Sequence, residues 1–326
     1  MGERHDYVAL EWVKGEIAET LKQARQALED YVENPEDSSR LSFCLTYIHQ
    51  VHGTLQMVEF FGAALLAEEM EKLSQALLDN SIPNLNEALE VMMQAILQLP
   101  LYLDRIQTAR RDLPMVILPL LNDLRAARDE KLLSETSLFN PADLPEKAPL
   151  SSRHLEHLNA QDLPALLRKL RQVQQVSLVG LLRGQNIEKN LVNMGRVFSG
   201  LEKLSQGAPL QPLWQVALGL IEGLANQSVE LSASVRTLLR QLDGELRKLV
   251  RTQADGLNEA APADLLKNLL FYVAKAHPNS KHLQVIHERY RLADALPSEL
   301  LLDEERAHMA GPDRGAMRSV VTALCE

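Results

Sequence analysis

The sequence has little cysteine, few aromatic residues and little glycine. Only two of its 326 residues are cysteines, Cys44 and Cys325, and they lie far apart, which argues against a disulfide framework. Aromatic residues make up 4% of the chain and glycine accounts for 15 residues, whereas leucine and alanine are abundant. This balance favours helices over sheets.

Long hydrophobic runs are also missing. The longest candidate, residues 91–103, is interrupted by Gln94, Gln98 and Pro100, so we expect no membrane span. The first residues, MGERHDYVALEW, carry acidic side chains where a signal peptide needs basic and apolar ones, and the Ser/Thr of a myristoylation site is absent. These features predict a cytoplasmic protein.

The net charge of −10 is unevenly distributed. Residues 1–133 hold 12 Lys/Arg against 22 Asp/Glu, whereas residues 134–296 hold 19 against 16. An acidic first half argues against nucleic acid as a partner, because binding it requires concentrated positive charge. No glycine-rich phosphate loop, Ser-His-Asp order or paired carboxylates stand out, so we predict no cofactor. The strand pattern that an ATP-binding kinase core requires is likewise missing.

Apolar residues recur at helical spacing along nearly the whole chain. The pattern predicts an all-α fold of two tandem helical bundles. The first, residues 1–133, has four or five helices, and a linker with three prolines follows at 134–152. The second bundle covers 153–296, and 297–326 is expected to be a linker and the start of a truncated helix from Asp313. The predicted helices are 6–33, 37–58, 64–79, 85–107, 112–133, 162–182, 185–206, 209–226, 229–252, 263–277 and 279–293.

The stretch YIHQVHGTLQ, residues 47–56, lies in the second of these helices and contains two histidines. At 100° per residue, the apolar face of this helix points away from His49, while His52 lies at its edge. Gly53 lies close to His49 on the open side. A neutral imidazole is a competent nucleophile near pH 7, and a glycine beside it lets a partner approach. The side chains expected to complete this patch and contact a partner are Leu45, Gln56 and Phe60.

The string HQVHGTLQMV is similar to the signature H-x-x-K-G of histidine-phosphotransfer (HPt) domains. The match implies that His49 is the phosphoacceptor, that His52 occupies the usual lysine position and that Gly53 is the signature glycine. The departure is His52, because a mostly neutral imidazole replaces a cation that would hold phosphate oxygens. The resemblance therefore implies an HPt-like bundle that has lost part of its phosphate site, a pseudo-HPt.

Longer strings carry a second resemblance. HDYVALEWVKGEIAETLKQARQALE and LPLYLDRIQTARRDLPMVILPLLNDLRAAR resemble the N-terminal region of ChpA/PilL-type chemosensory hybrid histidine kinases, whose phosphorelay controls type IV pili and twitching motility. QNIEKNLVNMGRVFSGLEKL, in the second bundle, resembles these kinases and the related pilus regulator FimL. The resemblance implies a regulatory region whose partners are response regulators, pilus-regulatory adaptor proteins or other domains of the same kinase.

Three functions remain open at this point. The patch around His49 and Gly53 is a docking surface of a pseudo-HPt module, or an active phosphotransfer site with His52 orienting the phosphate, or part of a structural helical spacer. A metal site is not predicted, because residues near His49 and His52 in the sequence supply no third ligand on the same face.

Overall fold

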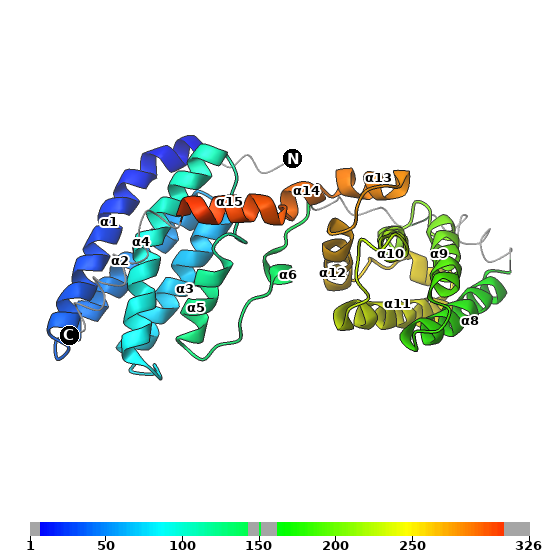
Figure 1. Cartoon of the computed structure of the whole chain (residues 1–326), viewed down its shortest axis with the longest axis horizontal. Helices are drawn as coiled ribbons and strands as arrows, with labels where there is room; N and C mark the ends of the chain where they lie inside the picture. Colours follow the sequence, from blue (N-terminus) through cyan, green and yellow to red (C-terminus); the bar gives the residue numbers. More distant parts are fainter. Residues whose placement is uncertain (1–6, 143–149, 151–161, 310–326) are drawn as a thin grey trace. The chain divides into compact units, whose positions relative to one another are not determined.

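The structure is a computed structural model that describes residues 7–142, 150 and 162–309. Regular structure in these residues is helical, and no strand occurs among them (Figure 1). The predicted all-α fold is therefore confirmed. Contacts divide the chain into two compact units: residues 1–138 together with 297–326, and residues 139–296.

The first unit is built from long helices that pack side by side (Figure 1). Helix α2 packs on both α1 and α3, and α4 also contacts α1 and α3. The apolar residues of α2 that face this core are fully or nearly fully buried, Ile48 and Leu55 among them. The helices are α1 (Tyr7–Glu33), α2 (Ser39–Met57), α3 (Phe61–Leu78), α4 (Leu85–Ala109), α5 (Leu118–Ala126), α6 (Glu135–Leu138) and α15 (Glu299–Met309).

Helix α5 is shorter than the sequence predicts. We expected a helix over residues 112–133 with Pro114 in its first turn, but residues before Leu118 form turns instead. Pro119 lies in the first turn of α5, where its fixed φ angle and missing N–H cost the helix nothing. The second proline, not the first, therefore marks where the helix begins.

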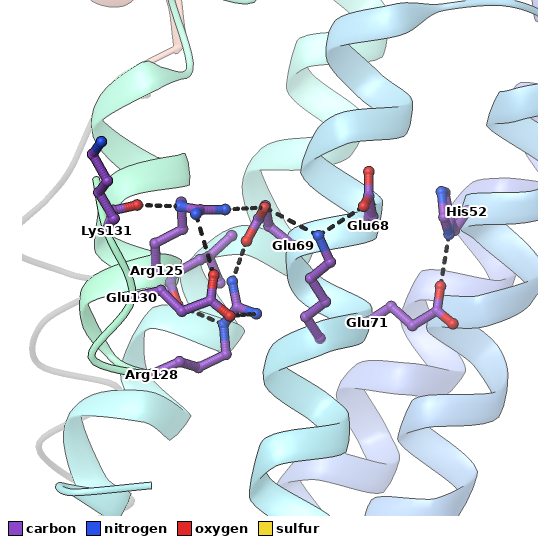
Figure 2. A network of polar contacts seen from close by, with 10 residues as sticks. His52, Glu68, Glu69, Glu71, Arg125, Arg128, Glu130 and Lys131 are labelled. Carbon is purple, nitrogen blue, oxygen red and sulfur yellow. Dashed lines mark hydrogen bonds and ion pairs between the residues drawn. The ribbon is translucent and has the colours of Figure 1, made fainter. Parts of the chain in front are cut away.

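Helix α3 carries a buried carboxylate, Glu69, whose side chain is 1% exposed. Arg125 donates to it from Nη1 at 2.7 Å, and Arg128 forms an ion pair with its second oxygen. Both arginines also contact the exposed Glu130, and Lys72 lies 3.6 Å from Glu69 (Figure 2). A buried charge is tolerated only when it is paired in this way, so the network fixes α3 against the end of α5 and the residues that follow it.

Helix α15 packs against α4, although the whole second unit separates them in sequence. Leu302, Glu305 and Met309 are its buried residues. Glu305 accepts two hydrogen bonds from the guanidinium of Arg105, at 2.8 and 2.6 Å. The expected linker at residues 297–326 is therefore wrong for 299–309, because these residues form a helix with a core-facing side. The helix expected from Asp313 lies outside the described residues.

The second unit surrounds helix α10, most of whose residues are buried. Trp214 of α10 is fully buried and stacks on Phe198 of α9, with ring centroids 6.1 Å apart. A Cβ at Gly219 would lie 2.8 Å from Ile286, so glycine here permits close helix packing. The helices are α8 (Leu163–Leu182), α9 (Ile187–Leu204), α10 (Gln211–Ala225), α11 (Ala233–Thr252), η1 (Asp255–Asn258), α12 (Ala263–Ala274), α13 (Lys281–Arg289) and α14 (Leu292–Ala295).

We predict that Glu69→Gln destabilises the first unit far more than Glu68→Gln. The first substitution leaves Arg125 and Arg128 without their buried counter-charge, which costs about 3–5 kcal/mol in such networks. Glu68 lies one residue away, is 40% exposed and forms a surface ion pair with Lys72, so its replacement should cost less than about 1 kcal/mol. Denaturant unfolding followed by circular dichroism measures both, and equal losses would contradict the assigned role of Glu69.

Candidate interaction surface on helix α2

The two histidines of α2 are joined by one carboxylate of the neighbouring helix. Glu71 of α3 lies between them, with Oε1 2.8 Å from Nδ1 of His49 and Oε2 2.6 Å from Nδ1 of His52. The side chain of His49 is 71% exposed and that of His52 is 14% exposed. Figure 2 shows Glu71 on the side of α3 toward His52, with Glu69 directed toward the arginines.

The hydrogen bonds to Glu71 have an electrostatic consequence. Burial raises the pKa of the Glu71 carboxyl, but the hydrogen bonds and charge of His49 and His52 outweigh burial, so the pKa lies below its ordinary value of 4.5. Each ring has Nδ1 engaged by an anionic acceptor, which favours a proton on Nδ1 and leaves Nε2 as the basic nitrogen. For His52 that Nε2 is buried and has no hydrogen-bond partner among the described residues.

Gly53 opens the helix surface beside His49. A Cβ at Gly53 would meet no atom within 4 Å. Residues on this side of α2 follow at intervals of three and four: Phe43, Thr46, Gln50, Gly53 and Met57, of which all are exposed except the half-buried Gly53. Phe43 is 50% exposed and Met57 is 85% exposed. We call these five residues the α2 outer stripe. Its spacing is that of a helix seam that contacts another element.

The structure does not bring every predicted residue to this surface. Gln56 is exposed and Leu45 is half-buried, so both can border it. Phe60 was expected to contact a partner, and this is wrong, because Phe60 is fully buried and packs on the ring of Tyr7 at a centroid distance of 5.7 Å. Phe60 directly precedes α3 and lies outside α2. The direction of its side chain therefore cannot be calculated from the 100° per residue of α2.

Sequence reasoning missed Glu71 and, within the α2 outer stripe, every residue except Gly53. Glu71 lies on another helix, and no spacing within α2 could reveal it. Phe43 and Met57 could have been predicted from the sequence, because both lie on the open side of the helix when the helical angle is counted from His49. The exposed methionine and phenylalanine are what make the surface partly apolar.

The arrangement suits protein contact and nucleophilic chemistry rather than metal binding. The described residues include no group of three or more His, Cys, Asp or Glu side chains placed to hold a metal ion. None of the helices in the described ranges combines the length and apolar character needed to cross a bilayer. The site is the outward face of a helix in a bundle, with one imidazole exposed beside an open glycine.

The fold places the chain in the class of all-α proteins built from helical bundles. Comparison with protein families narrows this class. The model described as the FimL C-terminal domain matches residues 7–120, and the model described as the FimL scaffold protein second domain matches residues 159–303. The first match lies within the first unit, and the second covers most of the second unit and extends into α15.

A curated relative matches along nearly the same length. Scaffold protein FimL of Pseudomonas aeruginosa strain PAO1 is 29% identical over 320 residues, which cover 98% of this chain and 56% of the relative. The chain thus spans about half the length of that relative. No solved structure matches. Similarity to FimL was expected for the second bundle, and it extends over both bundles. The resemblance to a histidine kinase and to an HPt domain stays a prediction.

The lowered pKa of Glu71 predicts a pH-dependent stability. A carboxyl whose folded-state pKa is depressed contributes stability that is fully present above about pH 4.5 and is lost as the pH falls through the folded-state pKa. Glu71→Gln should therefore be less stable than wild type at pH 7, and the gap should narrow below pH 4.5.

Unfolding curves at several pH values measure this gap. Glu90→Gln, at an exposed position of α4, is the matched control and should follow wild type throughout. A gap for Glu71→Gln that stays constant from pH 7 to pH 3 would contradict the assigned hydrogen bonds.

Proposed function

We propose that this chain is a scaffolding module of a chemosensory system that controls type IV pili, and that the α2 outer stripe docks a response regulator or a pilus-regulatory adaptor. The observation that carries the proposal is the open space at Gly53 between the exposed Phe43 and Met57. The similarity to a protein named as a scaffold supports the same conclusion. The proposal places the chain in the cytoplasm.

The charges of the site favour docking over phosphate transfer. A phosphoryl group arriving at His49 would meet the carboxylate of Glu71, which already contacts the same ring. A lysine at the position of His52 would offset that charge, but an imidazole supplies no permanent cation there. Without a fixed positive charge the phosphate is poorly stabilised, whereas contact with a partner's surface needs no such charge.

Phosphotransfer is the second candidate, and one observation favours it. Glu71 engages Nδ1 of His49, so the lone pair of the imidazole lies on Nε2, and the side chain is 71% exposed. An exposed imidazole held in one tautomer by a carboxylate is an activated nucleophile. In this case His49 is the acceptor and His52 orients the phosphate. The third candidate is a structural spacer, which would neither accept a phosphoryl group at His49 nor bind a partner at α2.

We predict that Gly53→Arg weakens binding of the cognate receiver domain or adaptor at least about tenfold, because a long side chain then occupies the approach to the stripe. A loss of more than about 1.4 kcal/mol corresponds to that factor. The control is Gly244→Arg on α11, since Gly244 is also a helical glycine with nothing within 4 Å of its missing Cβ. Isothermal titration with purified partners measures both variants.

The same proteins separate the three candidates. If Gly53→Arg binds as tightly as wild type while Gly244→Arg is also unaffected, the docking proposal is wrong and the spacer remains. Incubation with the system's own kinase core, ATP and receivers tests phosphotransfer, and we expect no acid-labile label on the chain. A label that appears on wild type and disappears in His49→Gln would establish the second candidate instead.

A further inference from the structure

Helix α8 of the second unit presents apolar residues to solvent at regular spacing. Leu166 is 40% exposed, Val173 is 37% exposed and Val176 is 68% exposed. With Lys169, these residues follow intervals of three, four and three, the spacing of a seam that packs against another helix. Buried residues of α8, such as Leu167 and Leu178, point to the other side and contact the core of the second unit.

The exposed side of α8 is basic as well as apolar. Lys169 is exposed one turn after Leu166, and Arg183 is exposed directly after the last turn. The sequence of α8, LPALLRKLRQVQQVSLVGLL, contains no aspartate or glutamate. We call the exposed residues Leu166, Lys169, Val173, Val176 and Arg183 the α8 face. Its only charged residues are cations, and an apolar seam with such neighbours fits a partner helix that carries an apolar anchor among carboxylates.

The first unit contains a helix face of that kind. On α1, Trp12 is 81% exposed, and a Cβ at the neighbouring Gly15 would meet nothing within 4 Å. Glu11, Glu16 and Glu19 are exposed around them. We call these five residues the α1 face. A tryptophan is the side chain that most often anchors a protein interface, and such a large exposed apolar group in a monomer points to a contact surface.

We propose that this chain associates with a second copy of itself, with the α1 face of one copy against the α8 face of the other. Trp12 covers the valines of α8, Gly15 lets the helices approach, and the glutamates lie opposite Lys169 and Arg183. The contact is heterologous, because two different surfaces meet, so each copy retains one face for a further copy. This inference does not depend on the α2 outer stripe.

The composition of α8 favours a protein over a membrane as its occupant. Helices that lie on membranes use tryptophan or phenylalanine together with leucine on their apolar side. Helix α8 has no aromatic residue, and its exposed apolar residues are mostly valines. The unevenly charged chain itself supplies the complementary surface, since residues 1–133 hold 22 Asp/Glu against 12 Lys/Arg.

The contact is small and therefore weak. The α1 face spans Glu11 to Glu19, about 12 Å along the axis at 1.5 Å per residue. An interface of two short helix faces lies at the low end of the size range of specific interfaces, so we expect a dissociation constant of roughly 10 μM or more. Self-association must be measured over a range of concentrations, from about 1 to 500 μM on this estimate.

Sedimentation velocity and tryptophan fluorescence of the full chain form the first test. Trp12 and Trp214 are the two tryptophans, and Trp214 is fully buried, so an emission change on association reports on Trp12. We expect mass to increase and emission to shift to the blue together as concentration rises. A monomer of constant emission over this range would overturn the proposal, and so would a shift already complete at the lowest concentration, which would place the contact within one copy.

Charge reversal makes the test specific. The variant Lys169→Glu/Arg183→Glu and the variant Glu11→Lys/Glu16→Lys should each associate at least tenfold more weakly than wild type, because like charges then face each other. Mixed in equal amounts, the two should associate again, because each reversed face meets its complement in the other variant. Both reversals lie at exposed positions, so folding should be unaffected.

A matched control carries the same change of charge elsewhere in the second unit. Arg240→Glu/Arg247→Glu reverses two exposed arginines of α11 and should associate as wild type does. Equal weakening by this control, or a mixture of the two variants that stays monomeric, would overturn the proposal. Sedimentation with vesicles containing anionic lipid completes the test: vesicle binding lost in Lys169→Glu/Arg183→Glu, without self-association of wild type, would assign the α8 face to a membrane.

Discussion

The buried carboxylate of Glu69 fixes the rotation of α3 within the first unit. An apolar helix face tolerates small rotations, but a charge that is 1% exposed must keep its partners, Arg125 and Arg128. Glu69 and Glu71 are two residues apart, about 200° around the helix. The rotation that directs Glu69 to the arginines therefore directs Glu71 to α2 (Figure 2). The position of the carboxylate between the histidines follows from an ion pair on the opposite side of α3.

This coupling explains why the candidate site lies on regular helices and not on loops. His49, His52 and Gly53 lie on one helix and Glu71 on the next, and α2 and α3 pack closely. Sites on packed helices are held more precisely than sites on loops. A surface of this kind changes little in shape when a partner binds, so its specificity depends on which side chains project from it. The glycine at its centre and the exposed Met57 are therefore as informative as the histidines.

Periodicity predicted the bounds of most of the helices to within a few residues. A helix that packs on a core needs an apolar face, and that face requires apolar residues at intervals of three and four. The helical angles also place Cys44 and Ile48 on the apolar face and His49 away from it, and in the structure Cys44 and Ile48 are buried and His49 is exposed. Periodicity failed where the information is not local. Phe60 follows the end of α2, so its angle could not be counted from that helix, and Glu71 reaches the histidines only through the packing of α3.

The tail shows a further limit. Residues 299–309, ELLLDEERAHM, combine apolar residues with a run of charged ones, and their helix is held by α4, far away in sequence. Arg105 and Glu305 are 200 residues apart, so no window of sequence contains both partners of the contact. Short strings of residues in the second bundle were enough to indicate the similarity to FimL. The boundaries of the units could not be predicted in this way, because they depend on this long-range contact.

The return of α15 to α4 also determines how the chain would respond to mechanical load. The second unit is inserted in the sequence between two segments of the first unit. The chain therefore leaves the first bundle after α6 and returns to it at α15, so that α1 and α15 belong to the same bundle. A pull between α1 and α15 would act first on the α4–α15 contact, held by Arg105 and Glu305. Only after that contact has parted would tension reach the second unit, which until then is shielded from force.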